Sequence, residues 1–320
     1  MLAPVILFVY NRPNHTKITL DALKKNTLAK DSILIIHCDG ALLNKDLEYY
    51  ENIEAVRQIC DNIDGFRDII IIKSDYNKGL VNSIIEGVTE TLNKFEKVIV
   101  LEDDLITSPY FLEFMNEGLD VYQKHNNVYS INGYCFPLDN INEYISFLIP
   151  LIGTWGWGTW KDKWSILDIK ISNKEYLINN QYIQKCFNFG KYEYSKMLTS
   201  NEKSWGIIWY YSVFLHHGLC LFPSKSLVQN IGFDGKGTNC GDYNPYYTKL
   251  SDKKITVLKE YQINLKYYSY VANFLSKDLY NQKYYNRIIN KINKIFKYIP
   301  ILFTIIFIYS FLVLIFTFAN

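Results

Sequence analysis

Short apolar runs alternate with helix-like segments through the first third of the chain, and this alternation constrains the fold more than any other feature. Each run is continuously apolar, as in strands of a parallel sheet covered on both faces. The runs are Pro4–Tyr10, Ile33–His37, Ile69–Lys73 and Lys97–Leu101. The helical segments between them are Thr16–Lys25, Asp46–Cys60 and Leu80–Asn93. The pattern predicts an α/β fold with a mainly parallel sheet flanked by helices.

Polar residues follow each apolar run, where the predicted strand ends. They are Asn11 and Arg12, then Asp39, then Asp75 and Asn77, and last the triplet Glu102, Asp103 and Asp104. The carboxyl ends of parallel strands meet at one edge of a sheet, so we expect a ligand site there. No G-x-G-x-x-G follows the first run and no G-x-x-x-x-G-K-[ST] occurs. Dinucleotide binding of the Rossmann kind and P-loop chemistry both lose support.

The acidic triplet 102–104 is the strongest candidate for a metal site. Adjacent carboxylates at the end of a buried strand are costly without a cation. Mg²⁺ or Mn²⁺ held by one or two of them, and completed by phosphate oxygens, removes that cost. The simpler alternative is a solvated acidic turn before the helix predicted over Tyr110–Tyr122. The apolar strand before the triplet and the other polar residues on the same edge favour the metal site.

The segment Val98–Phe114, VIVLEDDLITSPYFLEF, resembles the metal-binding segment of GT-A-fold nucleotide-sugar glycosyltransferases. The likeness is strongest to the N-acetylglucosaminyltransferase I type and to bacterial family 2-like enzymes. It implies that Asp104 contacts Mn²⁺ or Mg²⁺ directly, with Asp103 as a further candidate ligand. It also implies that Glu102 and Asp103 approach the sugar and the ribose.

The resemblance is continuous over residues 4–114 and patchy to Cys240. The opening ILFVYNRP resembles the family's first strand and the loop that touches the nucleotide. Asp39 matches the acid that reads the base, and the turn Asn77-Lys78-Gly79-Leu80 resembles an N-x-G-L turn before the metal strand. By this resemblance the donor-binding residues of the first half are Tyr10, Asn11, Arg12, Asp39, Asn77 and Gly79.

The segment Gly153–Trp164, GTWGWGTWKDKW, concentrates aromatic side chains and glycines. Flat aromatic faces suit sugar rings, and glycines let a backbone approach a ligand closely. In the family a Gly-Trp segment lies below the acceptor and the donor sugar. We therefore expect Trp155 and Trp157 to form a wall of the site, with an aromatic core cluster as the alternative.

Three carboxylates are candidates for the base that removes the acceptor proton. Glu202 lies in EKSWGIIW, near a tryptophan as in the family. The sequence departs from the family pattern because Gly206 and Ile207 follow where some relatives carry an acid. A surface charge on a helix start is an equal alternative for Glu202. Asp162 and Asp234 are its rivals.

The segment Asn230–Cys240, NIGFDGKGTNC, is rich in glycine and polar residues, as are lids that close over a nucleotide sugar. Lys236 is placed to reach a diphosphate from such a lid. Relatives often carry His where Asn239 stands, which weakens any ligand role at that position. A plain turn is the alternative for the whole segment.

The C-terminal residues Tyr298–Ala319 contain no charge and are long enough to cross a bilayer of roughly 30 Å as a helix. Lys283, Arg287, Lys291, Lys294 and Lys297 precede them. Basic residues beside a membrane span stay on the cytoplasmic side. These features predict a single-pass anchor at the C-terminus in the inner (cytoplasmic) membrane, with the catalytic domain in the cytosol.

The predicted organisation is therefore a Rossmann-like GT-A catalytic domain over 1–250, with a C-terminal helical tail and one transmembrane helix. Residues 1–114 form the nucleotide-sugar half and 115–250 the acceptor half. A basic helical region over 251–297 and the transmembrane helix over 298–319 follow.

The resemblance implies a metal-dependent, inverting glycosyltransferase of the hexosyl or N-acetylhexosaminyl type. Its donor is a nucleoside-diphosphate sugar, and its acceptor is a glycan or lipid-linked glycan such as a lipopolysaccharide core, held at the membrane. A net charge of +2 argues against a nucleic-acid partner. Two alternatives are a sugar nucleotidyltransferase and a catalytically inactive, membrane-tethered glycan-binding protein.

Overall fold

The computed structural model describes residues 1–139, 141–199, 204–235 and 244–277. By its contacts the chain divides into two units, Met1–Phe274 and Leu275–Asn320. The architecture below is that of the first unit. The predicted domain boundaries at 250 and 297 stay a prediction.

The first half of the unit contains four neighbouring parallel strands, as predicted. They are β1 (Val5–Val9), β2 (Ile33–Cys38), β3 (Asp68–Lys73) and β4 (Lys97–Glu102), in the spatial order β3-β2-β1-β4. The helices between them are α1 (Pro13–Lys24), α2 (Leu47–Asp61) and α3 (Leu80–Phe95), with a short helix η1 at Ala29–Asp31. Helix α1 begins earlier than predicted because Pro13, with its fixed φ, is favoured in a first turn.

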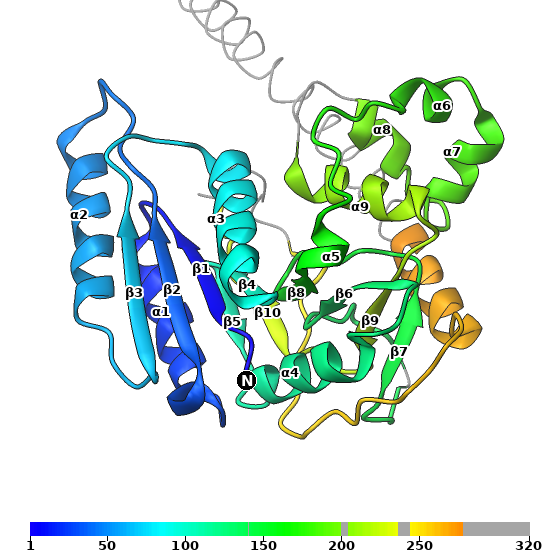
Figure 1. Cartoon of the computed structure of the whole chain (residues 1–320), viewed down its shortest axis with the longest axis horizontal. Coiled ribbons are helices and arrows are strands. Elements are labelled where there is room, and N and C mark those ends of the chain that lie inside the picture. The colour runs from blue at the N-terminus through cyan, green and yellow to red at the C-terminus, as the bar shows by residue number, and fades with distance from the viewer. Residues whose placement is uncertain (140, 200–203, 236–243, 278–320) are drawn as a thin grey trace, which may run out of the picture. The chain divides into compact units, whose positions relative to one another are not determined.

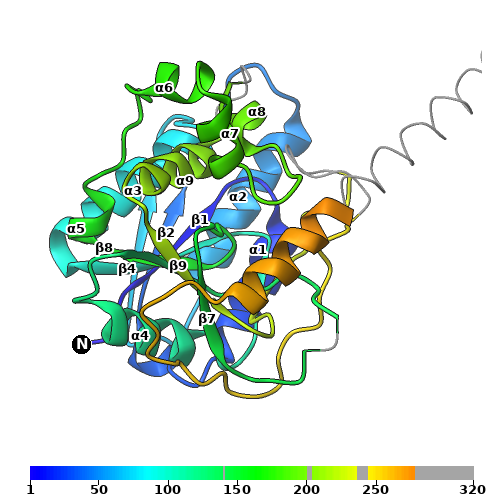
Figure 2. The same ribbon diagram turned by 90° about the vertical axis from the view of Figure 1, so that its right-hand side faces the viewer.

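The second half extends the same sheet with strands of both directions. They are β6 (Val128–Asn132), β7 (Ser146–Ile149), β8 (Trp157–Trp160) and β9 (Leu219–Pro223). The described residues thus form an eight-stranded sheet in the order β3-β2-β1-β4-β8-β6-β9-β7. Strand β8 is antiparallel to β4 and β6, and β9 is parallel to β6. The carboxyl ends of β6 and β9 therefore lie at the same edge as those of β1 to β4. Strands β9 and β7, at the end of the sheet, are labelled in Figure 2.

The remaining helices belong to this second half. They are α4 (Phe111–Tyr122), α5 (Lys161–Trp164), α6 (Lys174–Ile178), α7 (Gln181–Phe187), α8 (Tyr194–Thr199) and α9 (Trp205–Leu215). A further helix begins at residue 265.

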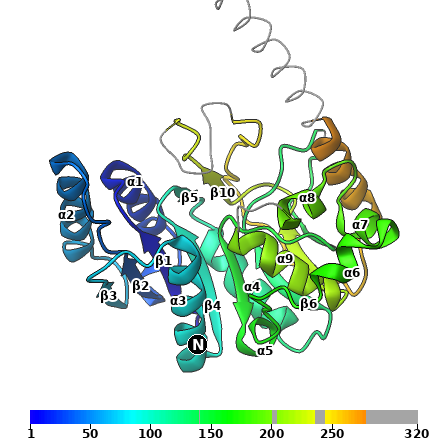
Figure 3. The ribbon, with the colours of Figure 1, turned by 90° about the horizontal axis from the view of Figure 1, so that it is seen from above.

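Alternate residues of the strands build a separate core on each face of the sheet. Leu7 of β1 joins the core that includes residues of α1, α2 and α4. Its neighbour Phe8 joins the core that includes residues of α3 and α9. Because side chains alternate along a strand, a continuously apolar strand has both faces covered. Figure 1 shows α3 in front of the strands, and Figure 3 shows α1 and α2 on their other side.

The predicted membrane anchor needs correction. Within the part of the chain that the structure describes, no helix has both the length and the apolar character to cross a bilayer. Crossing takes about 20 apolar residues, whereas α3 has 16 residues and carries charges. The segment predicted to span, 298–319, and the basic residues before it lie outside the described residues. The single-pass anchor, the inner-membrane location and the membrane-held acceptor are therefore not supported.

Candidate functional site

The polar ends of β1, β2 and β4 meet at one edge of the sheet, as the sequence indicates. Val9 of β1 pairs with Cys38 of β2, and Phe8 pairs with Glu102 of β4. The residues that follow these strands therefore emerge side by side. This edge, which we call the rim, holds Arg12, Asp39 and the triplet 102–104.

One guanidinium binds two carboxylates at the rim. The Arg12 Nη2 atom pairs with Asp103 and lies 3.0 Å from Oδ2 of Asp104. The Arg12 Nε atom donates to Asp103 Oδ2 at 3.3 Å. Asp103 and Asp104 are only 4% and 7% exposed. Thr19 of α1 donates to the carbonyl of Asp103 at 2.8 Å, so the helix after Arg12 also holds the triplet in place.

The triplet carries more negative charge than Arg12 neutralises. Burial, with the charges of Asp104 and Asp103 added, raises the pKa of Glu102 to about 8. Burial also raises the pKa of Asp103 to about 6 against the opposing effect of Arg12. Burial lowers the pKa of Arg12, but the two aspartates outweigh it and the pKa lies above its usual range. A second cation at the rim would relieve this excess of acid.

The carboxylates fit a hard divalent cation that takes most of its ligands from elsewhere. Among the described residues, no three His, Cys, Asp or Glu side chains are arranged to hold a metal ion. Mg²⁺ commonly uses only one or two carboxylates, together with water and substrate phosphates. Asp103 and Asp104 supply such a pair, so the residues present fit a metal that binds together with a diphosphate.

A small second sheet brings the second half of the chain to the triplet. Strand β5 (Leu105–Thr107) pairs antiparallel with β10 (Val228–Asn230). Beyond β10, Ile231 N donates to the Asp104 carbonyl at 2.9 Å. A Cβ at Gly232 would lie 2.4 Å from Asp104 Oδ2, so only glycine permits this approach. The segment expected to form a lid therefore packs on the triplet, and its described part ends at residue 235.

Asp234 reaches the rim from this segment. Its Oδ2 atom lies 3.4 Å from Nε2 of His15, which belongs to α1. His15 is close enough to Asp103 to affect its pKa. His15 was not predicted from the sequence, although it lies three residues after Arg12, a spacing that places side chains on one face of a helix. Nor was Asn230 predicted, whose Oδ1 accepts from Gly232 N at 2.7 Å.

The three candidates for the base are placed very differently. Asp234 lies at the rim, whereas Glu202 and also the diphosphate candidate Lys236 lie outside the described residues. Asp162 follows β8 at the opposite edge, because Trp160 pairs with Lys97 at the start of β4. The length of β4 separates the two edges by about 16 Å. The side chain of Asp162 is 68% exposed there, so the structure does not bring it to the triplet.

Asp39 closes a turn at the rim with four hydrogen bonds. It accepts from the backbone N–H groups of Gly40, Lys78 and Gly79 at 2.8, 2.8 and 3.0 Å, and from Asn77 Nδ2 at 3.2 Å. These use all the acceptor directions of a carboxylate. Asp39, Asn77 and Gly79 thus come together, and the carboxylate is engaged within the chain. Reading of a base by Asp39 stays a prediction.

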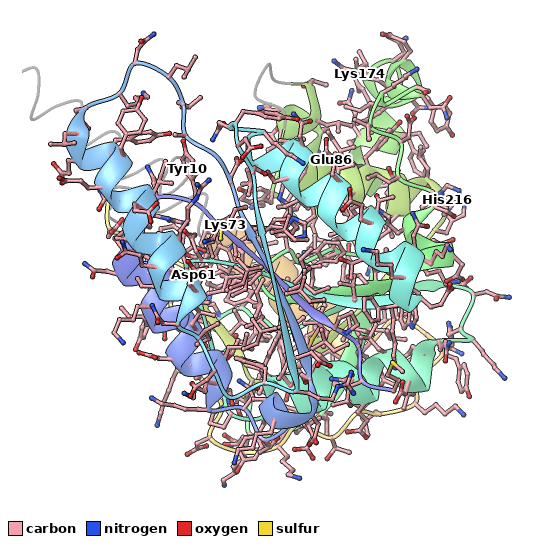
Figure 4. The ribbon with its side chains drawn as sticks, turned by 60° about the vertical axis from the view of Figure 1, so that its left-hand side comes forward. Tyr10, Asp61, Lys73, Glu86, Lys174 and His216 are labelled. Atoms are coloured by element: carbon pink, nitrogen blue, oxygen red, sulfur yellow. The ribbon has the colours of Figure 1, made fainter. Side chains whose placement is uncertain are left out.

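Tyr10 follows β1 and lies beside α2. Its hydroxyl is hydrogen bonded to that of Tyr49, and the two rings meet edge to face with centroids 6.0 Å apart. Figure 4 labels Tyr10 near the start of α2, at the opposite end of the helix from Asp61. Burial and the Tyr49 hydroxyl raise the pKa of Tyr10 well above its usual range. Asn11, which follows Tyr10, is half-buried on the same side of the site.

The two tryptophans expected to form a site wall separate. Trp157 has no exposed surface and packs against Trp205 and Trp164, with centroids 5.2 and 5.6 Å apart. It belongs to the core that includes residues of α3 and α9, so it offers no face to a ligand. Trp155, which precedes β8, is half-buried. Its ring centroid lies 6.0 Å from that of Phe233, the residue after Gly232. Trp155 therefore packs against the segment that follows β10.

No family model and no curated protein matches the sequence. Similar solved structures include S. aureus TarS 1–349, with 11% identity, a TM-score of 0.41, and coverage of 71% of this chain and 60% of that one. Mannosyltransferase PcManGT from Pyrobaculum calidifontis, in complex with GDP-Man and Mn²⁺, has 11% identity, a TM-score of 0.37 and coverage of 68% and 70%. Mouse xyloside xylosyltransferase 1 has 9% identity, a TM-score of 0.36 and coverage of 68% and 83%. The chain spans about three fifths of the TarS fragment.

Proposed function

We propose that this protein transfers a sugar from a nucleoside-diphosphate sugar to a hydroxyl of an acceptor glycan. The observation that carries the proposal is the pair of buried aspartates, Asp103 and Asp104, held by Arg12 at the carboxyl edge of a parallel sheet. Such an edge is where α/β proteins bind their ligands. The resemblance of residues 98–114 to metal-binding segments of glycosyltransferases favours a hexosyl or N-acetylhexosaminyl donor.

The rim residues divide the work of the reaction. Mn²⁺ or Mg²⁺ held by Asp104, with Asp103 beside it, would stabilise the charge on the leaving diphosphate. Arg12 adds a fixed positive charge next to these carboxylates and is itself held by them. Glu102 ends β4 directly before this pair and can bind a hydroxyl of the donor sugar.

We assign the base to Asp234. Its carboxylate lies 3.4 Å from His15 of α1, and this pairing limits its orientation. A base that deprotonates the acceptor hydroxyl allows a single displacement, which inverts the anomeric carbon. Trp155 lies next to Phe233 on the same side and can support the acceptor ring.

The first experiment measures nucleotide release from a panel of UDP-, GDP- and CMP-sugars with the full chain, in Mn²⁺ and in EDTA. We expect slow release from one donor that requires the metal. Asp104→Asn should lower it at least about 100-fold, since it removes a charge at the leaving group. Asp162→Asn is the matched control, because the same change falls at the opposite edge.

Other outcomes would replace the proposal. Formation of a nucleotide sugar from a nucleoside triphosphate and a sugar phosphate would identify a sugar nucleotidyltransferase. Glycan binding without release from any donor would identify a binding protein. Equal release by wild type and Asp104→Asn would remove the triplet from the mechanism.

Asp234→Asn tests the base separately. We expect donor binding, followed by thermal shift, to be unchanged and turnover to fall about 100-fold. His15→Gln should give a smaller loss and shift the pH profile of turnover, as a positioning residue would. An Asp234→Asn enzyme with full turnover would move the assignment elsewhere.

A further inference from the structure

A cavity opens at the same edge of the sheet as the triplet, beyond the carboxyl ends of β6 and β9. It has a volume of about 290 Å³. Lys225 follows β9 on its wall, Phe136 follows β6, and Tyr247 and Lys249 come from the segment after residue 243. That segment lies beside β10 in Figure 3, where Asn244 Nδ2 donates to the Asn230 carbonyl at 3.4 Å.

Two serines hold the backbone of the cavity wall in place, and two lysines give the wall positive charge. Ser224 Oγ donates to the Glu143 carbonyl and Ser226 Oγ to the Val228 carbonyl, both at 2.6 Å, so these hydroxyls hold the backbone. Within the described part of the chain, neither Lys225 nor Lys249 takes part in an ion pair. Asp139 is the acid on the wall, which leaves an excess of positive charge.

A line of aromatic rings connects the triplet to this cavity. Phe233 follows Gly232, and its ring packs edge to face against Trp155 with centroids 6.0 Å apart. The ring centroids of Trp155 and Tyr134 are 4.7 Å apart, and those of Tyr134 and Phe136 are 5.3 Å apart. Phe136 lies on the cavity wall. Phe233, Trp155 and Phe136 are half-buried and so keep part of their surface open.

The span between the two places suits a short oligosaccharide. Strand β9 is separated from β4 by β8 and β6, which gives about 14 Å at the usual strand spacing. Aromatic faces suit the apolar faces of sugar rings. Lysine ammonium groups bind phosphate and carboxylate as point charges.

We propose that the cavity at Lys225 and Lys249 binds an anionic group of the acceptor glycan, while the sugar units between it and the reacting hydroxyl lie along Phe136, Trp155 and Phe233. The proposal rests on the proposed function, because it names the acceptor of the same site. The acceptor is therefore a glycan that carries phosphate or carboxylate groups.

Binding of defined trisaccharides to the full chain tests this without turnover. The probes are trigalacturonic acid, maltotriose bearing a phosphomonoester, and neutral maltotriose, titrated by calorimetry at low and moderate salt. We expect at least one anionic probe to bind about tenfold more tightly than the neutral one, with an advantage that salt reduces. Preference for the first or the second tells carboxylate from phosphate.

The double variant Lys225→Gln/Lys249→Gln should bind the anionic probe no better than maltotriose. Lys124→Gln/Lys185→Gln is the matched control, since it removes two exposed lysines elsewhere and should bind as wild type does. Equal binding of charged and neutral probes, or an equal loss in the control, would overturn the proposal. Anion binding that depends on these lysines, in a protein that hydrolyses no donor, would overturn the proposed function and leave the cavity assignment standing.

Discussion

Arg12 is the residue on which the rim depends most, because it is the counter-charge to two buried acids. Its side chain is 24% exposed, and those of Asp103 and Asp104 are 6% and 10% exposed. A charge left buried without its partner costs far more than an exposed ion pair contributes.

Arg12→Ala should therefore lower the free energy of unfolding by about 3 kcal/mol. Urea denaturation in EDTA measures it. Arg67→Ala, which removes an exposed pair with Asp68, is the control and should cost under about 1 kcal/mol. Similar small losses in both variants would show that Asp103 and Asp104 do not need Arg12.

The buried His37 should make the free energy of unfolding depend on pH. Burial, with Lys78 nearby, lowers the pKa of this β2 residue to about 4. The unfolded chain binds a proton near pH 6.5, so it gains protons before the native state does as the pH falls. Stability is thus complete above pH 6.5 and is lost as the pH falls towards 4.

Between pH 7.5 and 5 the loss from His37 should be about 2 kcal/mol. The non-titrating variant His37→Met should show a smaller loss by that amount when urea midpoints are compared at the two pH values. Parallel losses in wild type and variant would exclude His37 as the cause.

At the scale of elements, the β5–β10 pair determines how closely two distant segments meet. Gly232 follows β10 and leaves no room for a Cβ beside Asp104. Gly232→Ala should displace the loop and lower turnover about 100-fold, because small misplacements of catalytic groups are costly. Circular dichroism melting should show that the fold persists. An active variant would mean that the loop moves away during turnover.

The same elements show what the sequence could predict and what it could not. The strands β1 to β4 were predicted because continuous apolar runs are a local signal. The contact between Gly232 and Asp104 was not, because β5 and β10 pair across more than a hundred residues. The position of Asp162 at the opposite edge could not be predicted, because the direction of β8 cannot be read from GTWGWGTW. Trp155 and Trp157 could not be told apart because β8 begins only at Trp157, after Gly156 with its positive φ, and this boundary cannot be read from the sequence.

At the scale of the whole unit, the segment 251–260 ties the two ends of the second half together. Ser251 N donates to Ser226 O at 2.7 Å, and Ser108 Oγ donates to Ser251 O at 2.7 Å. Thr256 pairs with the start of β7 through bonds of 2.9 Å to Tyr144 and Ser146. Ile255, between them, is 4% exposed.

A chain that ends at residue 250 should therefore fail to melt cooperatively, whereas one that ends at 274 should melt in a single transition. Circular dichroism during heating distinguishes them. The reason is the loss of these backbone hydrogen bonds together with the buried Ile255. Identical transitions in both chains would show that the segment is dispensable.

The reversal of chain direction at β8 separates the molecule into two independently variable parts. The residues proposed for the donor follow β1, β2 and β4, whereas the cavity proposed for the acceptor follows β6 and β9. The segment after β10, with Phe233 and Asp234, joins the two parts at the triplet. Loops on one side of β8 can lengthen or change charge without altering the register of the strands on its other side. A laboratory selection for new acceptors can therefore randomise residues 136–139 and 247–249, which line the cavity, and leave the chemistry of sugar activation intact.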